Sequence, residues 1–366
     1  MIEWIVFGMA VIHSLIFIFL FRAFRKVEVK IYPENCLTFS ILIPVRNEQE
    51  NIGNLLADIE KIEYPRDRLE VLVVDDSSED GTPEIVETFK ANYDLKYIQL
   101  HGEKKGKKSA LELGVSIAKN EIILTTDGDC RVQPAWLKSF NEAFSESTKL
   151  TVGPVRMIPT DFFGALQAVD FSILIGYAAS LVGLGKPSMS NGANMAYRRE
   201  VFTEVNGYDG NHEVPTGDDE FLLLKIAKKY PKGISYVKRT GAVVSTLPKV
   251  SFRDFLNQRK RWLSKWTLHK NASIILSVLL ILVDNLVMIA GWVGLASGFI
   301  TVWFLAFLFV RIVAKVLFGS SVDRLLGAST NLFAHIIYEL IYPFYVLLLS
   351  FASIFGNYTW KGRKYR

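Results

Sequence analysis

Long apolar segments at both ends of the chain, separated by a more polar middle, most constrain its fold. Residues 2–21 are almost entirely apolar. Three further apolar runs follow late in the chain, near residues 272–290, 295–313 and 332–355. A helix needs about 20 apolar residues to cross a bilayer. We therefore expect one membrane helix within residues 1–24 and three more within residues 271–356.

Basic residues beside the first apolar run predict the orientation of the chain. Four of them follow it directly: Arg22, Arg25, Lys26 and Lys30. Because Lys and Arg are enriched in the cytoplasmic flanks of membrane helices, we expect residues 38–249 to form a cytoplasmic domain of a multi-pass cell-membrane protein. The first run has neither a preceding basic region nor a small-residue cleavage site, so it is not expected to be a signal peptide.

The carboxy-terminal end conflicts with this orientation. Four spans would place the basic tail, residues 357–366, outside the cell, against the positive-inside rule. A helix hairpin near residues 272–313 or a re-entrant segment near Pro343 is the alternative. Asp284 lies inside a predicted span, where an acid is costly and usually faces protein or a polar path.

Charge and cysteine content exclude several classes of protein. The formal net charge of +5 suits anionic lipid headgroups or a diphosphate, but it is too small to indicate a nucleic-acid partner. Cys36 and Cys130 are the two cysteines. They are far apart in sequence, so they indicate neither a disulfide framework nor a zinc site and fit a reducing compartment.

Strand-like runs alternate with helical patterns through the middle of the chain. The runs are residues 39–44, 69–74, 95–100 and 121–126. Between them apolar residues repeat at helical spacing, and Thr82 is expected to be the N-cap of one helix, with Pro83 at its first position. This alternation predicts an α/β domain with a mainly parallel sheet and helices on both faces. Ligands of such sheets bind outside the carboxyl ends of the strands.

Two acidic clusters follow strands of this sheet. Asp127 and Asp129 flank Gly128 after the fourth strand. Two carboxylates there suit Mg²⁺ or Mn²⁺ bridged to a diphosphate. Asp75 and Asp76 follow the second strand and are expected to contact the base or ribose of a nucleotide. For both clusters the alternative is an ordinary acidic turn.

Two further polar clusters precede predicted helices. Lysines surround Gly106, and Lys107 is placed to neutralise a diphosphate at a helix N-terminus. The alternative is a solvated run of charge. Gly217 precedes three acids, among which we expect a general base. The alternative is an acidic first turn that favours the helix dipole.

Residues 250–270 combine basic and aromatic side chains, among them Gln258, Arg261 and Trp262. They predict an interfacial amphipathic helix, and Arg261 and Trp262 suit both membrane anchoring and substrate binding. Residues 162–184 are apolar enough to pass for another span. A single crossing there would separate Asp129 from the acids near residue 218, so we expect a buried or interfacial helix.

Six motifs occur in an order that resembles the family-2 inverting glycosyltransferases. The closer resemblance is to the membrane branch that holds cellulose, hyaluronan and poly-N-acetylglucosamine synthases and ceramide glucosyltransferases. It covers about residues 39–266. The motifs are Ile43-Pro44-Val45-Arg46-Asn47-Glu48, Asp75-Asp76, Gly106-Lys107, Asp127-Gly128-Asp129, Asp218-Asp219 and Gln258-x-x-Arg261-Trp262.

The resemblance implies a GT-A fold and a role for each motif. Asp75 or Asp76 would contact the nucleoside of a UDP- or GDP-sugar. Asp127 and Asp129 would approach the diphosphate and a Mn or Mg ion, and Asp219 would deprotonate the acceptor hydroxyl.

The remaining motifs would bind the sugar donor and the acceptor, a lipid or a growing glycan. Gln258, Arg261 and Trp262 would line both sites at the membrane surface. Asn191 and Gly192 would touch the donor sugar and the acceptor.

Three questions stay open at this point. Processive synthases often carry Thr-Glu-Asp at the base, whereas this chain has Gly217-Asp218-Asp219 and a small membrane part, so a polymer product is not indicated. A membrane nucleotidyltransferase would also use paired carboxylates, although the Gln-x-x-Arg-Trp element argues against it. A non-catalytic membrane scaffold is expected to have lost a carboxylate, and every carboxylate is present.

Overall fold

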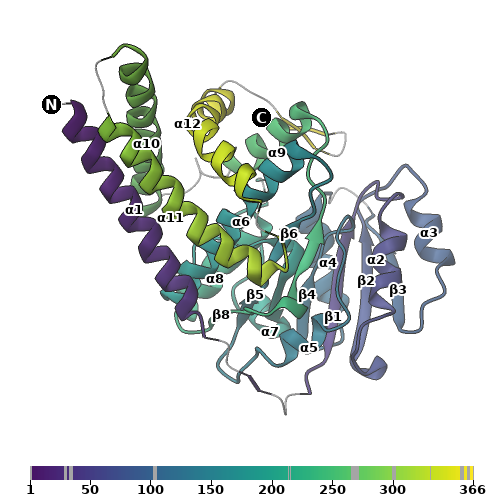
Figure 1. Cartoon of the computed structure of the whole chain (residues 1–366). Helices are drawn as coiled ribbons and strands as arrows, with labels where there is room; N and C mark the ends of the chain where they lie inside the picture. Colours follow the sequence, from purple (N-terminus) through teal and green to yellow (C-terminus); the bar gives the residue numbers. More distant parts are fainter. Residues whose placement is uncertain are drawn as a thin grey trace.

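A computed structural model describes residues 2–28, 31–32, 36–101, 105–212, 214, 216–264, 272–298, 302–329, 331–354, 358–360 and 363–365. Figure 1 shows a sheet domain beside a group of long helices contributed by both ends of the chain. Lys30 and Lys104, two of the basic residues in the predicted clusters, lie outside the described residues.

A seven-stranded sheet forms the centre of the domain, in the order β3-β2-β1-β4-β7-β5-β8. β1 pairs in parallel with β2 and β4, and β2 with β3, whereas β7 runs antiparallel to both β4 and β5. The predicted α/β class with a mainly parallel sheet is confirmed. The strands are β1 (Phe39–Val45), β2 (Leu69–Asp75), β3 (Asp94–Gln99), β4 (Ile122–Thr125), β5 (Leu150–Val152), β7 (Met195–Arg198) and β8 (Ile234–Tyr236).

Helices connect these strands and cover the sheet. They are α2 (Ile52–Ile59), α3 (Thr82–Thr88), α4 (Lys107–Ile117), α5 (Trp136–Asn141), α7 (Arg199–Glu204) and α8 (Asp218–Lys229), with the short turns η1 (Arg66–Arg68), η2 (Gly192–Asn194) and η3 (Thr240–Ala242). A second sheet pairs β6 (Val155–Met157) with β9 (Val244–Thr246). The predicted N-cap of α3 was wrong by one residue: Gly81 is the cap. The Thr82 hydroxyl instead accepts from the backbone N–H of Glu48 at 2.7 Å.

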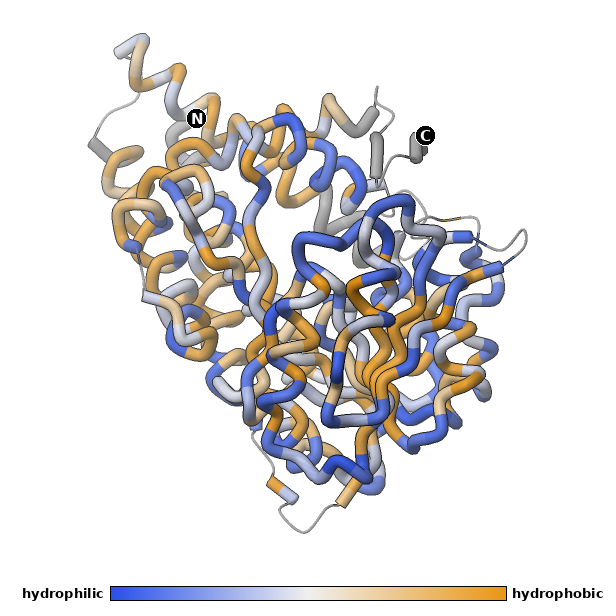
Figure 2. Tube along the Cα trace, turned by 90° about the vertical axis from the view of Figure 1, so that its right-hand side faces the viewer, coloured by the Kyte–Doolittle hydropathy of each residue, from blue (hydrophilic) through white to orange (hydrophobic). Residues whose placement is uncertain are grey.

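Continuous apolar strands explain the core. All seven residues of β2 are buried, as expected for a strand covered on both faces. Leu111 and Val115 of α4 belong to the same buried cluster as β1 and β2. Figure 2 shows hydrophobic residues concentrated in the strands and the long helices, and hydrophilic residues in the outer loops.

Five helices within the described residues are long and apolar enough to cross a membrane. They are α1 (Ile2–Lys26), α6 (Phe162–Gly183), α10 (Ala272–Ala296), α11 (Val302–Leu326) and α12 (Leu332–Ile354). The predicted span 295–313 corresponds to α11 but was placed too early in the sequence, because α10 continues to Ala296 and a turn with Gly298 at φ +73° follows before α11. The apolar run therefore crosses a helix boundary that hydropathy does not mark.

The helix α6 joins the two parts of the molecule. It packs on β6 and β8 and also on α1, α11 and α12. This packing agrees with the buried helix expected for residues 162–184. The amphipathic helix expected within residues 250–270 is α9 (Phe252–Ser264), and residues 265–271 lie outside the described part.

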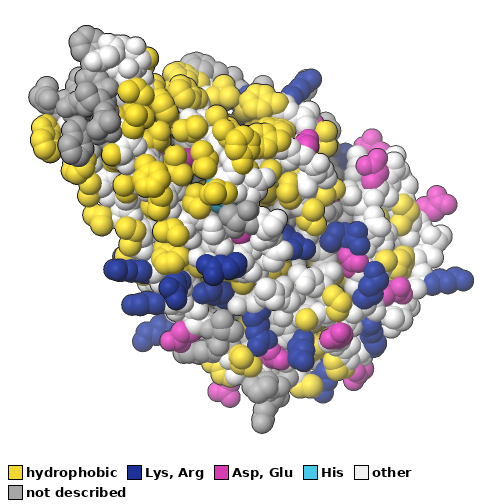
Figure 3. Space-filling model, in the orientation of Figure 1, with side chains coloured by type: hydrophobic (Ala, Val, Ile, Leu, Met, Phe, Trp, Pro, Cys, Tyr) yellow, Lys and Arg dark blue, Asp and Glu magenta, His cyan; other side chains and the backbone are white. Residues whose placement is uncertain are grey.

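Apolar side chains gather on one face of the molecule, over the long helices, and basic side chains border that face near the sheet domain (Figure 3). Trp4, Phe309 and Phe351 are among the exposed aromatic residues of these helices. Arg22 and Arg25 are exposed near the end of α1. A short hairpin of β10 (Tyr358–Trp360) and β11 (Arg363–Tyr365) follows α12, and β10 lies against α9.

Candidate active site

The acids of the fourth strand lie where the sequence predicts, in the turn after β4. Asp127 and Asp129 are both partly exposed there. The backbone N–H of Thr126 donates to the Leu42 carbonyl at 3.1 Å, which holds the start of this turn to β1. The turn therefore presents its two carboxylates at the carboxyl end of the sheet.

Lys107 connects this turn to the acids of α8. Its Nζ lies 2.6 Å from Asp127 Oδ1 and 3.5 Å from Asp218 Oδ2. Burial lowers the pKa of Lys107, but the charges of Asp127 and Asp218 outweigh it, so the pKa is raised overall. A protonated ammonium thus stands between the two acidic clusters that the sequence separates by about 90 residues.

Gly106 allows Lys107 to begin α4 at this place. Its φ of +98° is a conformation that favours glycine. The Gly106 N–H donates to Asp76 Oδ1 at 2.8 Å, so Asp76 is tied to the start of α4. The Asp75 carboxylate is fully buried, accepts from Ser78 and accepts from the Tyr97 hydroxyl at 2.9 Å. Of the predicted pair, Asp76 lies next to the lysine and Asp75 braces the turn.

Asp218 and Asp219 begin α8 but have different surroundings. Asp218 is buried beside Lys107. Asp219 is partly exposed; its Oδ2 accepts from the Gly192 N–H at 3.0 Å and its Oδ1 from the Glu220 N–H at 2.7 Å. These two bonds fix the orientation of the Asp219 carboxylate.

Gly192 lies close to the side chains of Asp218 and Lys107. A Cβ there would be 3.1 Å from Asp218 Oδ2 and 3.4 Å from Lys107 Nζ. Asn191 caps the turn η2, with its Oδ1 accepting from the Ala193 N–H at 3.0 Å. The predicted acceptor segment thus contacts the acids of α8 through its backbone.

Sequence reasoning missed two residues that support this site. Asn194 is fully buried and bonds Trp136, Pro154 and Ala242 at 2.7–2.9 Å. Lys108 is buried, and its Nζ donates to the carbonyls of Asn211 and Val214 at 2.5 and 2.7 Å. Burial lowers the pKa of Lys108 to about 8. Within a run of lysines nothing in the sequence distinguishes Lys108 from a solvated neighbour.

The helix α9 brings Trp262 to the buried helix α6. The Trp262 ring lies 6.0 Å from that of Phe171. Gln258 has a buried amide oxygen that no described residue satisfies. Arg259, which sequence reasoning also missed, is 3% exposed and packs over Trp262 at 4.3 Å. A basic residue on the Phe255–Trp262 face of the helix is the signal that would have identified it.

The residues present suit a divalent cation that is shared with a substrate. No group of three His, Cys, Asp or Glu side chains in the described part of the chain is arranged to hold a metal alone. Asp127 and Asp129 would supply two hard oxygen ligands, and Mg²⁺ commonly takes its other ligands from phosphates and water. One cation, the Lys107 ammonium, already contacts the Asp127 carboxylate.

Comparison with known proteins agrees with this geometry. Residues 40–205 match the family model described as glycosyl transferase family 2. This segment of the chain is therefore similar to the family-2 glycosyltransferases. The matched segment includes β4 with its acidic turn, Lys107 and Gly192, and it ends before α8 and α9.

Relatives and solved structures extend the comparison. Glycosyltransferase AglE of Haloferax volcanii is 31% identical over 49% of this chain and 58% of the relative. Poly-beta-1,6-N-acetyl-D-glucosamine synthase of Staphylococcus epidermidis is 26% identical over 50% of this chain and 45% of the relative. The chain thus spans about half the length of these curated relatives.

The mannosyltransferase PcManGT from Pyrobaculum calidifontis, solved with GDP-Man and Mn²⁺, has a similar fold. Its TM-score is 0.64 at 19% identity, over 97% of this chain and 99% of that chain. The likeness therefore includes the long helices as well as the sheet domain, and it concerns the fold alone.

Proposed function

We propose that this protein is an inverting, metal-dependent membrane glycosyltransferase. It transfers a sugar from a UDP- or GDP-sugar to a lipid or a growing glycan, with its sheet domain in the cytoplasm. The observation that carries the proposal is the Lys107 ammonium between Asp127 and Asp218, inside a family-2 glycosyltransferase domain. In the proposed function this arrangement would place a diphosphate-binding cation between Asp127 of the metal-binding turn and Asp218, the neighbour of the proposed base Asp219.

The donor would lie along the carboxyl ends of β2 and β4. Asp76 would face the nucleoside, because its carboxylate is fixed to the Gly106 N–H at the start of α4. Lys107 would neutralise the diphosphate as it leaves. A Mn²⁺ or Mg²⁺ ion held by Asp127 and Asp129 would add electrostatic stabilisation of the departing diphosphate.

Asp219 would be the general base. Inverting transfer is a single displacement in which the acceptor oxygen bonds to the anomeric carbon and the bond to the diphosphate breaks. The hydroxyl proton passes to a carboxylate in that step. Asp219 is partly exposed and oriented by two backbone N–H groups, whereas Asp218 is buried against Lys107. These surroundings favour Asp219 for contact with an acceptor.

A membrane acceptor would reach the site along the apolar face. Figure 3 shows that face beside the sheet domain, and α9 with Gln258, Arg261 and Trp262 packs against α12. The relative named as a poly-N-acetylglucosamine synthase and another named as a beta-monoglucosyldiacylglycerol synthase from Trichormus variabilis support a glycan or a lipid acceptor.

A donor panel tests the proposal. The purified protein in detergent should release UDP or GDP from at least one nucleotide-sugar, and release should stop in excess chelator and return with Mn²⁺ or Mg²⁺. An Asp129→Ala variant should lose the activity while it keeps its thermal unfolding midpoint, because this turn buries little apolar area. Full activity in chelator would contradict the metal role. Release of pyrophosphate from an added nucleoside triphosphate, with no UDP or GDP released from any nucleotide-sugar, would identify a nucleotidyltransferase instead.

A further inference from the structure

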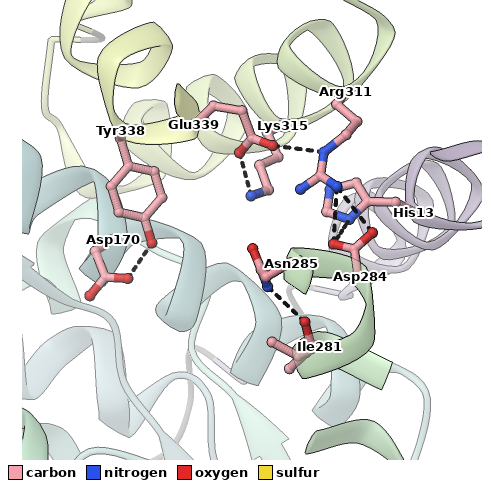
Figure 4. Close-up of polar contacts among 9 residues, drawn as sticks. All are labelled: His13, Asp170, Ile281, Asp284, Asn285, Arg311, Lys315, Tyr338 and Glu339. Carbon is pink, nitrogen blue, oxygen red and sulfur yellow. Dashed lines mark hydrogen bonds and ion pairs between the residues drawn. The ribbon is translucent and has the colours of Figure 1, made fainter. Parts of the chain in front are cut away.

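A network of buried charged residues connects the long helices and ends at α9. Figure 4 shows most of it, from His13 of α1 across α10 and α11 to Glu339 of α12, with Tyr338 and Asp170 at the end nearest the sheet domain. Charged groups inside membrane-type helices are costly, so they are retained where they pair with one another or serve a site.

The first part of this network fixes α12 to the other helices. Arg311 is fully buried and binds Asp284 at 3.0 Å and Glu339 at 2.9 Å. Glu339 also pairs with Lys315, and Asp284 bonds the His13 ring at 3.0 Å. Four helices, α1, α10, α11 and α12, thus share one set of ion pairs.

The second part extends this set to α6 and α9 through one carboxylate. Tyr338, the neighbour of Glu339 in α12, donates its hydroxyl to Asp170 of α6. The other oxygen of Asp170 lies 2.7 Å from Arg259 Nη2 of α9, and Arg259 is 3% exposed. Asp170 therefore joins α6, α9 and α12 at a single point.

Arg259 links this point to the residues of the proposed site. Its guanidinium lies 4.3 Å from the Trp262 ring and 5.0 Å from the Phe255 ring. Stacked aromatic contacts alone tolerate some rotation of a helix, whereas an ion pair in an apolar setting fixes one position. The orientation of the Gln258–Trp262 face of α9 thus depends on Asp170.

The charges in this network do not indicate a binding site for an ionic ligand. Arg259, Arg311 and Lys315 balance the three carboxylates, which are Asp170, Asp284 and Glu339. An anion-binding site would carry an excess of cations. The balanced set fits a positioning role.

We propose that Asp170 and Arg259 are positioning residues, which set the place of Gln258, Arg261 and Trp262 for sugar transfer. The inference rests on the proposed function, since it assigns the α9 face to the donor and acceptor. Neither residue is expected to touch the reacting atoms. Loss of the pair should impair transfer to the acceptor more than it impairs donor binding at Lys107 and Asp127.

The test compares Asp170→Asn and Arg259→Gln with the double variant and with Arg259→Lys. Each single change should lower the kcat for acceptor transfer at least about 10-fold, because a misplacement of about 1 Å can cost about 100-fold. The KM for the donor should change by a smaller factor than the kcat, because Lys107 and Asp127 also bind the donor in the proposed function. The double variant should be less impaired than the sum of the single losses predicts, and Arg259→Lys should recover part of the rate.

Asp323→Asn is the matched control. Asp323 is a buried acid of α11 that pairs with His335 of α12 at 3.2 Å and is not a partner of Arg259 in the Asp170–Arg259 pair. If this variant and Asp170→Asn lose transfer in the same proportion to their fall in thermal unfolding midpoint, the pair is only structural and the proposal is wrong. Wild-type transfer in Asp170→Asn would also overturn it.

A spin label distinguishes failure of this inference from failure of the proposed function. A label on Lys260→Cys in a Cys36→Ser background should be more mobile in Asp170→Asn than with Asp170 intact, whatever reaction the protein performs. Unchanged mobility would overturn the positioning role. Increased mobility in a protein that releases no nucleotide would overturn only the glycosyltransferase assignment.

Discussion

At the scale of single residues, the surroundings of a side chain separate neighbours that look alike in sequence. Asp218 is buried beside Lys107, and Asp219 is partly exposed and held by backbone N–H groups. Lys107 faces the acids, and Lys108 holds the carbonyls of Asn211 and Val214. These differences lead to one prediction about Asp218 and Asp219 and another about Lys108.

Asp219→Asn should abolish proton removal and leave donor binding intact. A positioned carboxylate typically contributes about 100-fold to 10,000-fold to the rate, so we expect at least about 100-fold slower transfer with a near-normal donor Kd by calorimetry. Asp218→Asn should instead weaken donor binding, because it removes a partner of Lys107. The reverse pattern, with Asp218→Asn slow in transfer and Asp219→Asn close to wild type, would move the base to Asp218.

Lys108 should make stability depend on pH. Its pKa in the folded state is about 8, below the ordinary value of 10.5, because burial disfavours the ammonium. Between these values the unfolded chain binds more protons than the folded chain, so stability should rise as the pH rises through this window. The unfolding midpoint of the wild type should therefore rise relative to that of Lys108→Met between pH 8 and 10.5. Parallel curves for the two proteins would contradict the assignment.

At the scale of elements, ion pairs and not only apolar contacts hold the long helices together. α11 carries Arg311 and Lys315 against Glu339 of α12. Pairs of this kind are expensive to break by removal of one partner, because the other charge stays buried.

Glu339→Gln should destabilise the helix group strongly. It leaves Arg311 and Lys315 without their shared acid, and we expect a loss of about 3–5 kcal/mol in the free energy of unfolding. The control is Glu79→Gln, which breaks an exposed pair with Arg46 at 3.2 Å and should cost about 0–1 kcal/mol. Denaturant titrations in the same detergent measure both variants. Equal effects would show that the buried pairs do not hold the helices together.

At the scale of the whole molecule, the contact of β10 with α9 indicates on which side of the membrane the basic tail lies. If α1, α10 and α11 cross the bilayer, an odd number of crossings separates the amino terminus from the tail. α12 packs on α6 and α9 as well as on α10 and α11, and it contains Pro343. This arrangement would place the tail with the sheet domain, in agreement with the positive-inside rule.

Cysteine labelling in sealed vesicles tests this placement. In a Cys36→Ser background, Lys364→Cys should react with an impermeant maleimide from the same side as Glu84→Cys, which marks the sheet domain. Gly298→Cys, in the turn after α10, should react from the opposite side. Labelling of residue 364 together with residue 298 would show that α12 crosses the membrane.

The sequence by itself determined the features that depend on local pattern. Uninterrupted β-branched runs such as 69–74 specify buried strands, and long apolar runs specify membrane-type helices, because the burial preference of each residue is expressed within one element. The positions of Asp127 and Asp129 after β4 followed from the same local logic. The order of the motifs, rather than any single one, carries the resemblance to the family-2 glycosyltransferases.

Only the tertiary structure decided what depends on partners distant in sequence. The antiparallel direction of β7, the junction between α10 and α11, the separate roles of Asp75 and Asp76, and the pairing of Asp170 with Arg259 were not predictable from local pattern. Lys107 meets Asp218 across 111 residues of chain, since 218 − 107 = 111. The strength of an ion pair depends on distance and burial in the folded chain, and neither quantity is encoded in the spacing of residues along the sequence.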